Sequence, residues 1–510
     1  MPDNAVNSKR IAKNSILLYG RMIIVMAIGL YSSRIVLRSL GVEDYGIYNL
    51  VGGLVVFFTV INSAMLSSTQ RYINYGLGNS DKWDVSTIFH TAWIIHIILA
   101  ILIVILAETL GLWLLTHKLQ IPLNKVDVAI FVFQVSVVTV VIQVLAIPYN
   151  AVLVAHEKMS VFAVISIVQS VLTLLVAFSL LLVDDKRLWL YAILMCVVQS
   201  VIALSYYIYC RHHFLETAGR FVFEKNLFKE MVGFAGWCMV GCTAGIMYSQ
   251  GLNILLGMFF LPFVNAARGI AVTIQNALSQ VFNNVQTAVV PQLMQSYARH
   301  DIEYFNSLIF KSSKYFSFLL LLVAIPFFIR TPQILQLWLG EEPDYSTIFS
   351  RILVCITIID AVSAPLMRAS DATGDIKKYH LVVGGVLLTI VPIAYVVLKF
   401  GGPPESVFYV FLVISIFALI ARLIILRQKI DLSIRDFSIS VLARIIIVLA
   451  TSFPICCFVS QYISADFGGL VLFCFVTTVV IVLGIYFLGA TRAERKFLNE
   501  KIRIIVNKFI

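Results

Sequence analysis

Arginine and carboxamide side chains recur inside long apolar stretches of this chain, and together they could bind an anion. In the apolar segment near 263–290, the polar side chains fall on one face of a helix drawn at about 100° per residue. That stripe consists of Asn265, Arg268, Gln275, Asn276, Ser279, Gln280, Asn283, Gln286 and Thr287. A similar stripe in the segment near 46–70 and just beyond it consists of Asn49, Thr59, Ser63, Ser67, Gln70, Arg71 and Asn74.

Each stripe must face protein or water, because an unpaired amide in hydrocarbon costs several kcal/mol. One interpretation is a pair of packed helix faces joined by amide hydrogen bonds. The other is a water-filled cavity. We favour the cavity, since an interface accounts poorly for Arg268 and for the Asn and Gln residues that share its stripe.

Arginines at several depths would give such a cavity a positive potential that suits an anionic head group. Arg21, Arg71 and Arg268 are the candidates, because an arginine within a membrane span is a functional candidate by default. Snorkelling to the inner head groups is the alternative for Arg21 and Arg71. Arg34 and Arg38 point about 120–140° away from Arg21 on the same helix. We therefore expect them to anchor the outer interface or, at most, to form the cavity rim.

Glu108 and Asp360 are the main acids within spans, and Asp360 could couple a cation or proton to transport. It could equally be a satisfied buried carboxyl group or pair with an arginine. No metal site is expected, since Cys238 and Cys242 share a helix face without a histidine or acid beside them. The sequence contains no nucleotide-binding loop and no hydrolase or metalloprotease motif. We expect no enzyme activity and no cofactor beyond an unidentified coupling cation.

The elements that carry these residues are membrane spans. The chain has 510 residues, of which 60% are hydrophobic and 13% charged, and its mean hydropathy is +0.94. Those values exclude an ordinary soluble domain and predict an all-α polytopic membrane protein. About 14 transmembrane helices are expected, near 14–38, 46–70, 88–115, 128–152, 160–183, 188–210, 231–257, 263–290, 315–339, 346–367, 380–400, 405–427, 437–460 and 467–489.

The net charge of +11 fits a membrane orientation rather than nucleic-acid binding. With a cytoplasmic N-terminus, most lysines and arginines fall on the inner side, where they meet anionic lipid. Both termini are therefore expected in the cytoplasm. The tail "TRAERKFLNEKIRIIVNKFI" is basic and amphipathic, and we expect it to lie on the inner leaflet.

The chain also contains an internal repeat, in which one shift of 216 positions aligns Gly20 with Gly236, Gly41 with Gly257 and Asn49 with Asn265. Six spans per repeat place the two halves in the same orientation, around a central substrate path. The expected organisation is a six-helix bundle at 1–210, a cytoplasmic connector at 211–230, a second six-helix bundle at 231–427, two additional helices at 437–489 and an amphipathic tail at 490–510.

The stretches "LRSLGVEDYGIYNLV" and "INSAMLSSTQRYINYGLGNSD" resemble the polysaccharide and O-antigen (Wzx-type) flippases of the multidrug/oligosaccharidyl-lipid/polysaccharide exporter superfamily. The Leu-Gly-x-x-x-Tyr-Gly turn is typical of them, as is the proline in "IPYNAVLVAHEKMSVFAVISIVQS". The segment "SAPLMRASDATGDIKKYHLVVGGV" repeats that second pattern.

The resemblance implies a V-shaped pair of six-helix bundles around a central cavity. It also implies translocation of a polyprenyl-diphosphate-linked oligosaccharide across the bacterial inner membrane, with glycan polymerase and glycosyltransferases as partners. Its diphosphate would meet arginines of the cavity, a role that Arg21 and Arg268 fit. A cation-coupled multidrug exporter of the same fold is the alternative. A membrane glycosyltransferase or polymerase is disfavoured because the outer loops are short.

Overall fold

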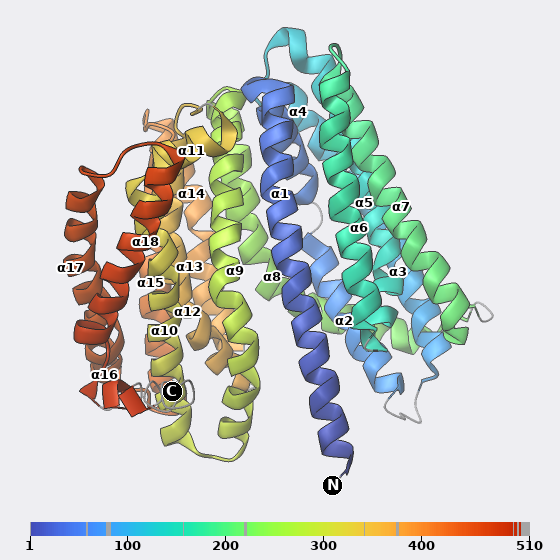
Figure 1. Cartoon of the computed structure of the whole chain (residues 1–510). Coiled ribbons are helices and arrows are strands. Elements are labelled where there is room, and N and C mark those ends of the chain that lie inside the picture. The colour runs from blue at the N-terminus through green and yellow to red at the C-terminus, as the bar shows by residue number, and fades with distance from the viewer. Residues whose placement is uncertain are drawn as a thin grey trace. The chain divides into compact units, whose positions relative to one another are not determined.

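A computed structural model describes residues 2–57, 60–77, 83–156, 158–218, 222–340, 342–373, 377–492, 494–496 and 499–500 (Figure 1). The main helices are α1 (Pro2–Phe57), α2 (Val60–Leu77), α3 (Val85–Leu106), α4 (Leu112–His117), α5 (Val126–Ala155), α6 (Met159–Ser179), α7 (Arg187–His213), α8 (Lys225–Phe259) and α9 (Pro262–Ala298). They continue with α10 (Ile302–Ile329), α11 (Thr331–Leu339), α12 (Ser346–Ala372), α13 (Lys377–Leu388), α14 (Ile390–Lys399), α15 (Ser406–Ile430), α16 (Ile434–Phe437), α17 (Ala443–Ser460) and α18 (Phe467–Gly484). A π-helical turn, Ile485–Gly489, extends α18.

The prediction of an all-α membrane protein is confirmed. Eleven helical segments among the described residues are long and apolar enough to cross a membrane. Each predicted span lies largely on helix among the described residues, with turns at Arg330 and Thr389 and at some span ends, but those carried by α2, α8 and α9 are not among the eleven. The two polar stripes lie on these helices and on the second half of α1, which lowers the hydropathy there. The count of 14 crossings therefore stays a prediction.

The span predicted near 315–339 begins earlier and ends earlier than expected. Its helix, α10, starts after Asp301, whose carboxylate accepts a hydrogen bond from the Tyr304 N–H at 3.0 Å. The predicted bounds left Lys314 outside the span, among the basic residues of the inner side. In the structure this lysine is 4% exposed and paired with Glu494, so its charge does not end the span.

Gly41 divides α1 into two helical pieces. Its φ of 77° and ψ of 168° are not helical, and a residue with a Cβ rarely adopts such a φ. The turn of the "LGVEDYG" stretch therefore separates the first predicted span from the second. Asn49, which opens the first polar stripe, lies on the second piece of α1.

The chain forms two compact units. Unit 1 comprises residues 1–269 and 387–407, and unit 2 comprises residues 270–386 and 408–510. In unit 1, α5 packs along α7, α1 along α6, and α2 along α8. Helix α14 also packs on α8 in this unit, where the rings of Phe259 and Tyr395 lie 5.7 Å apart. The division into six-helix repeats, which rests on the sequence pattern, stays a prediction.

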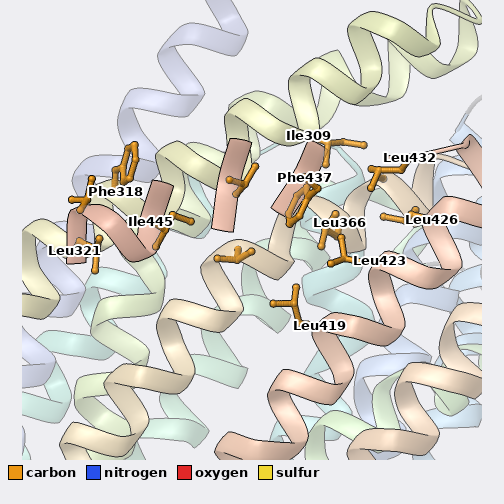
Figure 2. Close-up of a cluster of buried hydrophobic side chains, with 14 of the residues drawn as sticks. Ile309, Phe318, Leu321, Leu366, Leu419, Leu423, Leu426, Leu432, Phe437 and Ile445 are labelled. Atoms are coloured by element: carbon orange, nitrogen blue, oxygen red, sulfur yellow. The ribbon is translucent and has the colours of Figure 1, made fainter. Parts of the chain in front are cut away.

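The core of unit 2 is built around α10, α12 and α15 (Figure 2). The cluster includes Phe318 and Leu321 of α10, Leu366 of α12, and Leu419 and Leu423 of α15. Helices α17 and α18 lie side by side and both contact α10 (Figure 1). The two C-terminal spans are therefore an integral part of unit 2.

Candidate functional site

Three asparagines of unit 1 form a chain of hydrogen bonds, which we call the amide cluster (Asn49, Asn253 and Asn265). The Asn253 amide donates to the Asn49 carbonyl at 3.0 Å. The Asn265 amide donates to both the backbone and the side-chain oxygen of Asn253, at 2.8 Å each. Asn253 is 1% exposed and Asn265 is not exposed. The cluster thus joins α1, α8 and α9 through polar contacts that are shielded from solvent.

Glycines allow this close approach. A Cβ on Gly53 of α1 would lie 1.9 Å from the amide nitrogen of Asn253. A Cβ on Gly46 would lie 2.0 Å from the backbone oxygen of Pro262, at the start of α9. Small residues at helix contacts are a typical device of membrane bundles, because they let backbones approach. Gly46 and Gly53 therefore mark packing positions in unit 1, whereas of the repeated glycines that the structure describes only Gly257 does so, with Leu50 at 2.4 Å from its Cβ position.

Gly46→Ala should destabilise the protein by about 1–3 kcal/mol, because the new methyl group meets backbone that cannot rotate away. Thermal unfolding of the purified protein in detergent measures the effect. Gly52→Ala is the matched control on the same helix, since no atom lies within 4 Å of its Cβ position. There we expect no loss, because alanine is the better helix former. Equal unfolding temperatures for the two variants would contradict the packing.

Arg268 lies on α9 close to the amide cluster and is 7% exposed. One terminal nitrogen donates to the Ser249 carbonyl of α8 at 2.5 Å. Within the part of the chain that the structure describes, no carboxylate forms an ion pair with it. A guanidinium group has five N–H donors, so it keeps donors for an anion. Its planar shape suits phosphate oxygens.

The remaining stripe residues of α9 belong to unit 2 and differ in exposure along the helix. Asn276 and Asn283 are exposed, Gln275 and Ser279 are partly buried, and Gln286 is buried. The Gln286 amide donates to the Ala364 carbonyl of α12 at 3.3 Å. Buried and exposed amides therefore occur together on this stripe, so a packed interface describes only part of it.

The other predicted arginines lie in varied surroundings. Arg71 is exposed, and its guanidinium carbon lies 4.2 Å from the centre of the Phe234 ring. Arg38 is exposed and Arg34 is partly buried. The side chains of Arg21 and Ser63 lie outside those that the structure describes.

Asp360 belongs to a network of charged and polar groups within unit 2. Arg422 of α15 acts electrostatically on its carboxylate. The same arginine donates to the Tyr379 hydroxyl at 3.0 Å and to the Ser363 hydroxyl at 3.2 Å. Among the described residues no ion pair joins Asp360 to Arg422, so its pairing with an arginine stays a prediction.

The sequence interpretation missed Arg422 and Asn253. It counted Arg422 only among the basic residues of the inner side, although Ser415, Ala418 and Leu426 share its helix face and are all buried. That buried face is the signal that could have drawn attention to this arginine within its span. Asn253 lies outside both polar stripes, and its role depends on the close approach of two other helices.

Comparison with known proteins defines the family. The model of the family described as polysaccharide biosynthesis protein matches residues 11–297, which is more than half of the chain. The chain belongs to this family. No curated protein matches the sequence of this chain.

Several solved structures share the fold of this chain. Lipid II flippase MurJ, in an inward closed conformation, is 13% identical with a TM-score of 0.72, over 92% of this chain and 99% of MurJ. An inward-facing multidrug resistance MATE family transporter of the MOP superfamily is 15% identical with a TM-score of 0.67, over 82% and 98% of the two chains. The MATE multidrug transporter DinF-BH is 14% identical with a TM-score of 0.61, over 83% and 96%.

The chain is thus a member of the polysaccharide biosynthesis family that shares its fold with a lipid II flippase and with multidrug transporters. Among the residues that the structure describes, no three His, Cys, Asp or Glu side chains group as metal ligands. The guanidinium of Arg268 and the amides of the amide cluster suit the recognition of anions and of hydroxyl-rich molecules.

Proposed function

We propose that this protein translocates a polyprenyl-diphosphate-linked oligosaccharide from the inner to the outer leaflet of the bacterial inner membrane. The substrate would be a repeat unit of O-antigen, capsule or exopolysaccharide. The proposal draws on membership of the polysaccharide biosynthesis family and on the chemistry of Arg268. Both termini would lie in the cytoplasm, and glycosyltransferases and a glycan polymerase would act before and after it.

Arg268 is the observation that carries this proposal. It is a buried guanidinium that keeps free donors beside the amide cluster, and such a group is stabilised by an anion. The diphosphate supplies that charge. Binding requires the helices around Arg268 to separate, because only 7% of the residue is exposed. Alternating access provides such a movement.

The exposed amides of α9 suit the sugar part of the substrate. Asn276 and Asn283 have donors and acceptors that match sugar hydroxyls. With Gln275 and Ser279, they would form a wet path for the glycan, while the prenyl chain stays in lipid. Arg21, Arg71, Asn49, Ser63, Asn265 and Gln286 complete the proposed substrate-binding set, with Arg34 and Arg38 at its rim.

Asp360 is the residue that we propose for coupling to an ion gradient. A cation or proton would compete with Arg422 for its carboxylate. We expect Asp360→Asn to remove the dependence of transport on the gradient, as measured by substrate flipping in proteoliposomes with and without an imposed pH or Na⁺ gradient. A variant that flips substrate slowly but still responds to the gradient would contradict this role.

A cation-coupled multidrug exporter is the second candidate, because two of the structural neighbours are described as multidrug transporters. The experiment that separates the two functions is deletion of the gene. The flippase predicts accumulation of lipid-linked oligosaccharide in the cell, loss of surface glycan and unchanged drug sensitivity. Increased drug sensitivity with normal surface glycan would favour the exporter instead.

A further inference from the structure

A cavity of about 430 Å³ lies where the C-terminal end of the last span, beyond α18, meets the tail segment, by which we mean the described residues 492, 494–496 and 499–500 of unit 2, all of them helical. Half of its lining residues are basic, and the lining comprises Tyr486, Arg492, Arg495, Lys496, Asn499 and Glu500. None of these residues belongs to the proposed substrate path. The cavity therefore needs an explanation of its own.

Hydrogen bonds hold the walls of this cavity in place. Thr491 and Glu494 form a reciprocal capping box, in which the Glu494 carboxylate accepts from the Thr491 N–H at 2.7 Å and the Thr491 hydroxyl accepts from the Glu494 N–H at 3.2 Å. The Tyr486 hydroxyl donates to the Asn499 side chain at 2.9 Å. The tail segment is thus held both at its start and near Asn499.

The positive charge of the lining stays largely uncompensated. Arg492, Arg495 and Lys496 are spaced so that they share one helix face. Glu494 cannot neutralise them, because both of its oxygens accept from Lys314 of α10, at 2.7 and 2.8 Å. Within the described ranges, no ion pair engages Arg492 or Lys496, and Glu500 is the single acid of the lining.

The position of the cavity along the chain indicates the source of its ligand. It directly follows the apolar span Phe467–Gly489, and Tyr486 lies in the last turn of that span. Residues at such a position meet the head-group layer of the membrane, where tyrosine and basic side chains gather. An anionic ligand at this level is the phosphate of a lipid.

We infer that this cavity binds the head group of an anionic phospholipid of the phosphatidylglycerol type. Arg492 and Lys496 take the phosphate oxygens, and the Glu500 carboxylate accepts hydrogen bonds from the glycerol hydroxyls. The bound lipid fixes the last span of unit 2 to its leaflet. This site is separate from the proposed transport function and does not depend on the substrate.

Native mass spectrometry of the full chain, titrated with phosphatidylglycerol, tests this site. Arg492→Gln combined with Lys496→Gln should weaken binding by about 30-fold, from about fivefold for each basic group at the membrane surface. Lys225→Gln combined with Lys229→Gln is the matched control, since these exposed lysines of α8 do not line the cavity. This control should bind as tightly as the parent.

Three results would overturn the inference. The first is equal affinity of the two double variants, and the second is equal affinity of the parent for phosphatidylcholine. The third is displacement of the lipid by inorganic phosphate at a similar concentration, which would identify a site for free anions. If the double variant does not fold, as judged by circular dichroism, Arg492→Gln alone should still weaken binding about fivefold.

Discussion

Replacement of Arg268 by alanine is expected to abolish glycan at the cell surface, while the protein reaches the membrane in normal amount. Charge-assisted hydrogen bonds contribute about 1.5–3 kcal/mol each, so losing two to a diphosphate weakens substrate binding by about 100-fold or more. Arg268→Lys should retain only part of the activity, because an ammonium group cannot bind two phosphate oxygens in the same planar arrangement. Immunoblotting of membranes and staining of surface glycan measure both quantities.

The control for this prediction is Arg34→Gln combined with Arg38→Gln. These arginines are more exposed than Arg268, and we expect them to act mainly as anchors at the outer interface. Their loss should reduce surface glycan far less. Normal surface glycan in Arg268→Ala cells would contradict the role of Arg268, and complete loss in the double variant would show that the rim arginines bind substrate.

The second large effect is expected for Glu494→Gln, which leaves Lys314 charged and 4% exposed without its partner. Breaking a buried ion pair in this way costs about 3–5 kcal/mol. The N-terminal end of the tail segment should then detach from α10, with faster hydrogen exchange at residues 491–500. Asp184→Asn is the control, because its pair with Arg187 is exposed to solvent and contributes little. Unchanged exchange in Glu494→Gln would contradict the prediction.

This ion pair also predicts a dependence on pH. Burial raises the pKa of Glu494, but hydrogen bonds from Lys314 and Thr491 outweigh that effect and hold the pKa below its usual value of 4.5. A carboxyl group with a lowered pKa stabilises the folded state above the usual value and loses that contribution as pH falls through the folded-state pKa. Attachment of the segment, followed by hydrogen exchange at residues 491–500, should therefore be complete at neutral pH and weaken in acid below about pH 4.5.

Hydrophobic runs were sufficient to predict the helices and the class of protein. The long apolar stretches match helices, because the bilayer admits few other structures. Periodicity also selected Asn49 and Asn265, which share a hydrogen-bonded cluster in unit 1. Residues selected by their repeat spacing are thus joined through Asn253, a residue that the stripe pattern did not include.

The contacts that depend on distant segments could not be predicted from one helix at a time. The pair Lys314–Glu494 joins residues 180 positions apart, and the network of Arg422 joins three helices. A helical wheel gives the direction of a side chain but not its partner. This is why the sequence interpretation counted Lys314 and Arg422 only among the basic residues of the inner side.

The most direct test of the proposed function is flipping of a defined substrate by the purified protein. Proteoliposomes would carry a fluorescent polyprenyl-diphosphate oligosaccharide, and a membrane-impermeant quencher would report its movement between leaflets. We predict that the protein exposes label from the inner leaflet, that Arg268→Ala does not, and that a multidrug substrate such as a cationic dye is not transported. Transport of the dye with no movement of the lipid-linked glycan would contradict the proposed function.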